Sequence, residues 1–324
     1  MATTRDLFKS VTNNIDMVSA EIVAAYRTVC RRASITSRNL GGLDIGDTVA
    51  LDIGYVGDHA VLFNGRIRSI GVASPRGTYV IEAEDALWQA KEFYFIPETL
   101  DDPWSRSNIS AEDLIEDILT EAGLTDYVGY ATGFTFATGT QDVEIKLVSA
   151  WDYISWICEV VGGHVYADAA GQVHFVNLDP VPGAVDGVLT TGEGKEIIFS
   201  DYQKSDDRAR NQVVVFGYGA IKATANAAPN GYTLPANFYK TAIISHTMID
   251  TQAMAQAAAD LNLTALNRLT ESVKCDIEGD PNLDCRDTVT VTEAFSGISG
   301  DWFVHECRHA IGEDGYKTYM MLTK

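Results

Sequence analysis

Short apolar runs rich in β-branched residues alternate with clusters of Gly, Asp and Asn over residues 18–97. This alternation predicts successive short antiparallel strands, and a strand every ~8–12 residues is typical of a barrel or a sandwich. Asn64-Gly65 is a hairpin-type dipeptide, so we expect a turn between Val61–Phe63 and Arg66–Ile70. We assign residues 1–97 to a first β-barrel domain that begins with an arm of about 17 residues.

The pattern changes to a helical period within residues 98–180. Ser110 and Ser149 each precede an amphipathic stretch, and each has an aspartate three residues later, which is typical of a helix N-cap. Glycines follow both stretches, where a left-handed residue ends a helix. An alternating segment with Asp168 and Gly171 at its turn comes next. These features predict an α+β insert made of two helices and a hairpin.

Strand patterns return within residues 181–324. Residues 211–219 hold a continuous apolar run, and a helix is expected near residues 251–269 because Ala, Gln and Leu dominate there. Ile45-Gly46-Asp47-Thr48-Val49 is loosely echoed by Cys285-Arg286-Asp287-Thr288-Val289, and each segment precedes a Gly-containing strand. The chain is therefore expected to be mainly β, with two similar antiparallel β-barrel domains, the second spanning residues 181–324, and a helix–helix–hairpin insert between them.

The chain is strongly acidic, and this property argues against several classes of function. Its 324 residues include 24 basic and 45 acidic side chains, which gives a formal charge of −21. Such a surface repels nucleic acid phosphates, so specific DNA binding is not expected. No apolar run reaches the ~18 residues that a membrane span needs, and the N-terminus carries no secretory core. We expect no membrane anchor and assembly in a cytoplasm.

A metal site is the strongest chemical candidate that the residues offer. His305, Cys307 and His309 alternate along an expected strand, so their side chains would share one face, and imidazole and thiolate suit zinc or iron. Cys275 and Cys285 could add ligands or form a disulfide. The competing interpretation is a packed face with free thiols, and no short C-x₂₋₄-C knuckle supports the metal. We therefore expect no metal and no cofactor.

Catalytic patterns are weak. Paired carboxylates such as Asp101-Asp102 are abundant in a chain of this charge, and no G-x-S-x-G, H-E-x-x-H, P-loop or EF-hand pattern is present. Gly217-Tyr218-Gly219 is only half of a dinucleotide fingerprint, and it lacks the helix that should follow. We predict no catalytic residues, so the protein is not expected to be an enzyme.

Turn motifs follow one another along the chain in segments 45–49 and 63–67, in the insert, at the strand after Asn211 and through the C-terminal quarter. Their order resembles that of the central baseplate hub proteins of contractile phage tails, and the C-terminal quarter matches best. Cys285-Arg286 departs from the usual turn before Asp287. The motifs rest on ten turn positions: Gly46, Asp47, Gly65, Asn211, Gly217, Gly279, Asp280, Asp287, Gly300 and Gly315.

The resemblance implies two tube-like antiparallel β-barrel domains per chain and a homotrimeric ring in the virion tail baseplate. Two similar barrels per chain would present pseudo-sixfold symmetry to a hexameric tail tube protein and threefold symmetry to a trimeric central spike protein. Other baseplate (wedge) proteins would surround the ring, and DNA would pass through an acidic lumen without specific binding. Two alternatives remain at this point: a tail-associated cell-wall hydrolase, and a metal-binding structural module using His305, Cys307 and His309.

Overall fold

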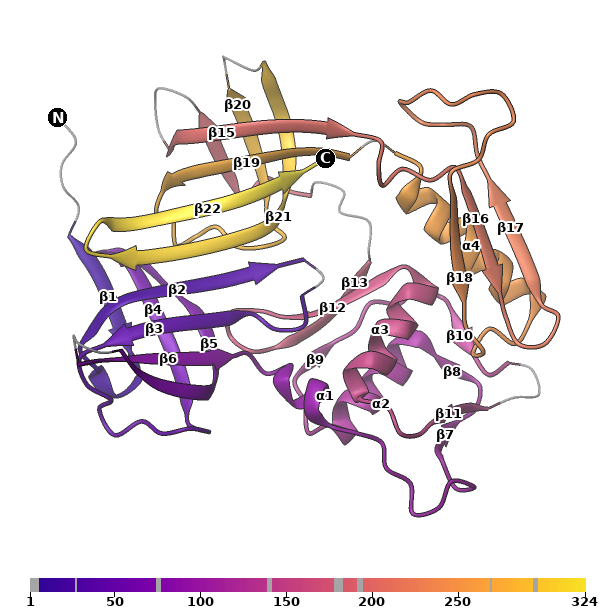
Figure 1. The fold of residues 1–324 in the computed structure, drawn as a ribbon, viewed down its shortest axis with the longest axis horizontal. Helices are drawn as coiled ribbons and strands as arrows, with labels where there is room; N and C mark the ends of the chain where they lie inside the picture. The colour runs from indigo at the N-terminus through magenta and orange to yellow at the C-terminus, as the bar shows by residue number, and fades with distance from the viewer. Residues whose placement is uncertain are drawn as a thin grey trace.

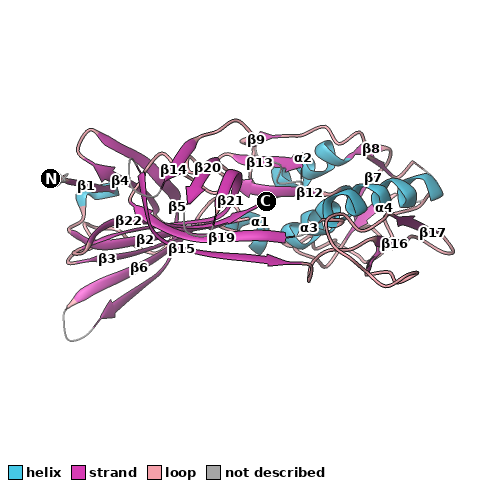
Figure 2. Ribbon diagram, turned by 90° about the horizontal axis from the view of Figure 1, so that it is seen from above, coloured by secondary structure: helices cyan, strands magenta, loops and turns pink. Residues whose placement is uncertain are grey.

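The computed structural model contains two groups of strands stacked on each other and an α+β lobe beside them (Figure 1). The molecule is flattened, and its helices other than one 3-10 turn lie in the lobe (Figure 2). The mainly β fold class with an α+β part is confirmed. The structure describes residues 6–26, 28–73, 77–138, 142–177, 183–190, 195–268, 270–293 and 297–324.

The first group is an antiparallel sheet curled around its own core. Its strands are paired in the order β1-β4-β5-β6-β3-β2, and alternate side chains face the core. Its elements are β1 (Leu7–Val11), the 3-10 turn η1 (Thr12–Asn14), β2 (Met17–Ala25), β3 (Arg32–Ser37), β4 (Thr48–Tyr55), β5 (Asp58–Ala73) and β6 (Thr78–Glu84).

The second group has a core of its own, centred on the buried Trp302. Its pairings run β14-β20-β21-β22-β19-β15 and return from β15 to β14. β14 is parallel to both neighbours, which differs from the all-antiparallel arrangement expected from the sequence. The strands are β14 (Gly187–Thr190), β15 (Lys195–Ser205), β19 (Thr270–Glu278), β20 (Thr288–Glu293), β21 (Ile298–Gly312) and β22 (Gly315–Thr323).

The two groups repeat the same strand order. β1, β4, β5, β6, β3 and β2 correspond in sequence to β14, β20, β21, β22, β19 and β15. The register shifts also fall at equivalent positions. The pairing of β5 with β6 shifts between Ile67 and Ser69, and the pairing of β21 with β22 shifts between Val304 and Glu306. β2 and β15 also share a shift near their starts. The echo between residues 45–49 and 285–289 therefore belongs to a repeat of a whole structural unit.

One strand pair joins the two groups into a single twelve-stranded sheet. β2 runs antiparallel to β21, with Ala20 opposite Ile311 and Ala25 opposite Glu306. An ion pair of 2.6 Å between Glu21 and Arg308 bridges the same two strands. The first core also includes Ile311 from β21 and Tyr316 from β22. The groups are thus continuous in hydrogen bonding and in packing.

The lobe is organised by two capped helices. The Ser110 hydroxyl accepts a hydrogen bond from Asp113 N, and the Ser149 hydroxyl accepts one from Asp152 N, so both expected N-caps are confirmed. Gly162 ends the second helix in a left-handed conformation. The elements are α1 (Trp88–Glu92), β7 (Trp104–Arg106), β8 (Ile109–Ser110), α2 (Ala111–Glu121), β9 (Tyr127–Val128), β10 (Thr135–Phe136), β11 (Val143–Ile145), α3 (Ala150–Val161), β12 (Gly163–Ala167) and β13 (Val173–Asn177).

Part of the C-terminal half packs with this lobe and not with the second strand group. β16 (Gln212–Phe216), β17 (Lys222–Asn226), β18 (Thr241–Ser245) and α4 (Gln252–Leu266) form a three-stranded sheet with one covering helix. Their buried residues join the same hydrophobic core as α2 and α3. The expected helix near 251–269 exists, but the packing distributes residues 181–324 over two cores where the sequence suggested one barrel domain.

The expected hairpin at Asn64-Gly65 is wrong. Both residues lie inside the single long strand β5, and the turn falls earlier, between β4 and β5. A Cβ on Gly65 would lie 2.3 Å from the Glu84 carbonyl oxygen and 2.6 Å from the Phe63 ring. The glycine is therefore required because β6 and an aromatic ring approach the backbone closely, and not because the chain turns there.

Candidate functional site

Two turns, one in each strand group, have matching hydrogen bonds. In the first turn Asp44 N donates to Asp47 Oδ2 (2.8 Å), and in the second Asp284 N donates to Asp287 Oδ2 (2.6 Å). Gly46 N donates to the carbonyl of the neighbouring strand β5, and its counterpart donates to that of β21. The counterpart of Gly46 (φ 99°) is Arg286 (φ 85°), a non-glycine residue in a left-handed conformation.

Arg31 connects the first strand group to the second turn. Its side chain is 4% exposed, and Nη2 lies 2.6 Å from Asp284 Oδ2. Nη1 donates to the Leu62 carbonyl at 2.9 Å, so the guanidinium bridges both groups. A buried charge of this kind needs its partner, because removing one side leaves the other charge desolvated and uncompensated.

Asp85 supports the same connection from the start of the lobe. Its two carboxylate oxygens accept hydrogen bonds from Arg31 N (2.6 Å) and from Leu87 N (3.0 Å), just before α1. The residue is almost completely buried, and this burial raises the pKa of its carboxyl from 3.8 to about 7. Burial likewise raises the pKa of Asp287 to about 6. Both carboxyl groups are therefore shielded from water, and each accepts hydrogen bonds from backbone N–H groups that fix the local chain path.

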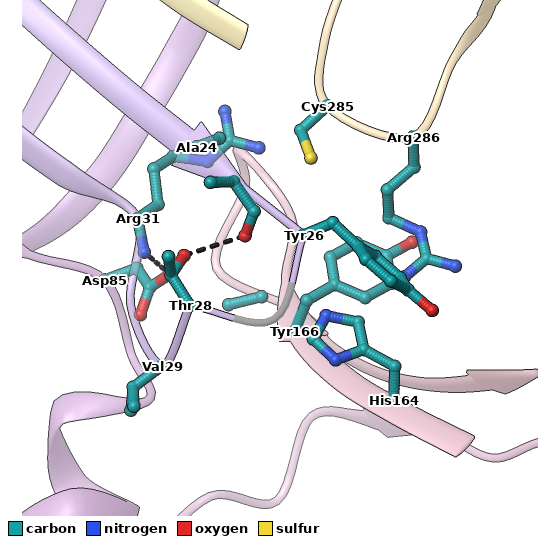
Figure 3. A pocket seen from close by; sticks show the side chains of 12 residues that line it. Ala24, Tyr26, Thr28, Val29, Arg31, Asp85, His164, Tyr166, Cys285 and Arg286 are labelled. Carbon is teal, nitrogen blue, oxygen red and sulfur yellow. Dashed lines mark hydrogen bonds between the residues drawn. The ribbon is translucent and has the colours of Figure 1, made fainter. Parts of the chain in front are cut away.

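All three units meet at a small cavity (Figure 3). Tyr26 comes from the first group, His164 and Tyr166 from β12 of the lobe, and Arg286 from the second turn. The Arg286 guanidinium lies 4.2 Å from the Tyr166 ring centroid, and the Tyr26 and His164 rings are 4.6 Å apart. The cavity has a volume of about 20 Å³, which is room for one water molecule and none for a substrate. The contacts around this cavity hold the three units together.

The three candidate metal ligands are not brought together as a set. Cys307 Sγ lies 3.2 Å from His309 Nε2, and His309 Nδ1 lies 2.7 Å from the Tyr316 hydroxyl. The His305 ring instead packs against Tyr26, beside the β21 register shift. Burial raises the pKa of the Cys307 thiol well above its usual range and lowers that of His309 to about 4, so both groups are neutral.

The described residues contain no group of three or more His, Cys, Asp or Glu side chains arranged to hold a metal ion. The disulfide considered between Cys275 and Cys285 is absent, because both are free thiols. Cys30, Cys158 and Cys307 are also free, and they are buried. Burial raises the pKa of Cys275 and of Cys285 to about 12, which keeps these two thiols unreactive.

The remaining turn positions divide into true turns and close approaches. Gly300 and Gly315 have φ near +100°, as turns or distorted strands require. Asn211 is buried and accepts a hydrogen bond from Lys240 N, and the buried Asp280 accepts one from Asn282 N. Gly217 and Gly279 resemble Gly65: a Cβ would lie 2.2 Å from the Ile249 carbonyl oxygen and 2.1 Å from the Tyr316 ring. They are packing positions and not turns.

Sequence reasoning missed the junction residues Arg31, Asp85 and Arg286. A usable signal existed in the repeated pattern Leu-Asp-x-x-Asp-Thr-Val, which begins at Leu43 and again at Leu283. It marks the two equivalent turns, and both leucines are buried in equivalent places. The partner of the second turn could not be read from it, because Arg31 lies more than 250 residues away.

The fold is thus two related strand groups, joined edge to edge by the β2–β21 pair, with an α+β lobe beside them. No family model matches the chain, and no curated protein matches it. Among solved structures, a tail protein from Neisseria meningitidis MC58 has a TM-score of 0.70 at 14% identity, over 98% of this chain and 96% of that one.

Two further structures share the fold. The 43 kDa tail protein of prophage MuSo2 from Shewanella oneidensis also has a TM-score of 0.70, at 10% identity, over 98% of both chains. An E. coli component of the type VI secretion system, described as structurally similar to T4 phage tail proteins, has a TM-score of 0.62 at 11% identity. It is matched over 97% of this chain and 76% of its own. The chain therefore has a tail-protein fold. None of its described helices is long and apolar enough to cross a membrane.

Proposed function

We propose that the protein is a structural hub of a contractile-tail baseplate that adapts a sixfold tail tube to a threefold spike. The observation that carries this proposal is the repeated strand order within one chain. Three copies of a chain that holds two equivalent units supply six similar units around one axis. Such a ring offers near-sixfold symmetry on one side and true threefold symmetry on the other.

The proposed partners are a tail tube protein, a trimeric central spike protein and the surrounding wedge proteins. Support comes from the tail-protein fold and from the E. coli neighbour, which is described as structurally similar to the T4 phage tail proteins gp27 and gp5. We place the protein in the virion baseplate after assembly in the host cytoplasm.

We propose that DNA passes along the sheet face that points away from both cores. On that face β2 and β3 present Glu21, Ser34 and Thr36, and neighbouring strands present Glu82 and Lys317. Arg308, the nearest cation to Glu21, is held in an ion pair with it. A largely polar face on which Arg308 is already paired offers phosphates few free cations, because affinity for DNA comes mainly from free Lys and Arg.

The test is the mass of the 35.2 kDa chain in solution, by light scattering, alone and mixed with tube and spike proteins from the same tail. We expect a trimer, or a monomer that becomes a trimer when the spike is added. Electron microscopy of the mixture should show a ring between tube and spike. A persistent monomer that binds neither protein would contradict the hub.

A further inference from the structure

In the described part of the twelve-stranded sheet, β15 and β5 each have an edge that lacks a strand partner over much of its length. β15 pairs with β19 from Ile197 to Ser205 on one side, but on the other it pairs with β14 only at Lys195 and Glu196. β5 pairs with β4 only as far as Arg66, so residues 69–73 have β6 on one side and no strand on the other. Backbone N–H and C=O groups along such edges are templates for another strand.

The repeat shows which edges are complementary. β2 occupies in the first group the place of β15 in the second, and β21 occupies the place of β5. β2 and β21 pair with each other inside the chain. The chain thus already contains one pairing between the β2 edge and the β21 edge. The equivalent edges, which are Ile197–Ser205 of β15 and residues 69–73 of β5, have no strand partner in the described part of the chain.

We propose that the free edge of β15 pairs antiparallel with the free edge of β5 in a second copy of the chain. The shared register shifts fix the alignment residue by residue. Ile22 lies opposite His309 in the internal joint. The equivalent residues are Tyr202 and Val72, which therefore face each other between copies, with Ser205 facing Ser69.

The surface chemistry of the two edges suits this pairing. Val72 is 69% exposed and Tyr202 is 39% exposed, so pairing would bury apolar surface of both side chains that now contacts water. The β15 edge holds one acid and one base, Asp201 and Lys204, and residues 69–73 hold no charge. In a chain of charge −21, where copies repel one another, these neutral edges are suitable places for contact.

The joint is head-to-tail, and such a contact produces a ring when the rotation closes and a filament when it does not. Closure at three copies rests on the proposed hub function, whereas the pairing of β15 with β5 does not. The strand pairing and the ring can therefore fail separately.

A disulfide across the proposed register tests the joint. Directly opposed residues of antiparallel strands have Cα atoms ~4.5–5.5 Å apart, within the reach of a disulfide. We expect the full-length Val72→Cys, Tyr202→Cys double variant to form covalent dimers and trimers under mild oxidation on denaturing gels. Each single variant and the parent chain, whose own cysteines are mostly buried, should stay monomeric on such gels.

The register has its own control in the Val72→Cys, Lys204→Cys pair, which shifts one partner by two residues and should cross-link at least fivefold less. Val72→Asp should convert the assembled protein to monomer, whereas Val56→Asp, a change at an equally exposed valine (68%) in the β4–β5 turn, should not. A trimer in solution without the specific cross-link would overturn this joint and leave the hub intact. A cross-linked open filament would support the joint and contradict the hub.

Discussion

At the scale of single residues, the equivalent turns show how a repeat acquires different roles. Both turns keep the same aspartate hydrogen bonds, but Gly46 in one is replaced by Arg286 in the other. The arginine accepts a left-handed backbone, which costs of order 1–3 kcal/mol, and its guanidinium stacks on Tyr166 of the lobe. The second turn therefore locks three units together, while the first remains a simple strand connection.

Asp85 should make the stability of this junction depend on pH. Its pKa is raised from 3.8 in the unfolded chain to about 7 in the folded one, so the folded state binds the proton more tightly. Its contribution to stability is full below pH ~3.8 and is lost as the pH rises through about 7. Urea midpoints at pH 6 and pH 8 should differ by less in Asp85→Asn than in the parent.

Asp85→Asn should also be less stable at both pH values, by about 1–3 kcal/mol, because an amide NH₂ would face a backbone N–H. The matched control is Asp142→Asn, which changes an exposed acid of the lobe and should keep the parent's pH slope. Equal slopes in all three proteins would show that Asp85 does not titrate in this range.

At the scale of secondary-structure elements, the sequence predicted features that depend on neighbouring residues, but not features that depend on contacts between distant segments. The caps at Ser110 and Ser149 are contacts between residues three positions apart, so the sequence displays them directly. The hairpin predicted at Gly65 was wrong because glycine is required there by the close approach of the Glu84 backbone on another strand. The parallel pairing of β14 likewise depends on β20, a strand ~100 residues later, and no local pattern encodes it.

Gly65 supplies a test of that reasoning. Gly65→Ala places a methyl group 2.3 Å from the Glu84 carbonyl oxygen, so β5 and β6 must separate. We expect a loss of roughly 1–3 kcal/mol in the free energy of unfolding, measured by chemical denaturation. Gly71→Ala in the same strand is the control: its nearest neighbour would lie 3.9 Å away, and its stability should change little. Similar losses in both variants would refute the close-approach explanation.

The same limit explains why the sequence does not show that residues 181–324 contribute to two cores. Ala- and Leu-rich periodicity identified α4 as a helix, but periodicity does not say which core a helix covers. α4 packs on β16 and β17, and its buried Met254 and Leu263 join the core of the lobe. The repeat itself was visible because both copies of Asp-Thr-Val open equivalent strands, β4 and β20.

At the scale of the whole molecule, the shared core predicts that a change in the second strand group weakens the first. Ile311 lies in β21 but packs in the first core with Ile22 and Ile35. Ile311→Ala should cost about 2–5 kcal/mol and should reduce hydrogen-exchange protection in β2 and β3. Ile277→Ala, an equally buried isoleucine of the second core, should reduce protection mainly in β19 and β22. The same protection pattern in both variants would mean that the two cores unfold as one.

The β2–β21 joint also has a consequence for synthesis on the ribosome. Glu21 and Arg308 are 287 positions apart, and the first core is incomplete without Ile311 and Tyr316. The first strand group emerges early, yet it cannot bury its open side until β21 and β22 have been translated. During that interval its apolar face is exposed to aggregation and to chaperones. A chain that stopped before β21 would lack the strand that completes the first core, so its first strand group would keep an exposed apolar side.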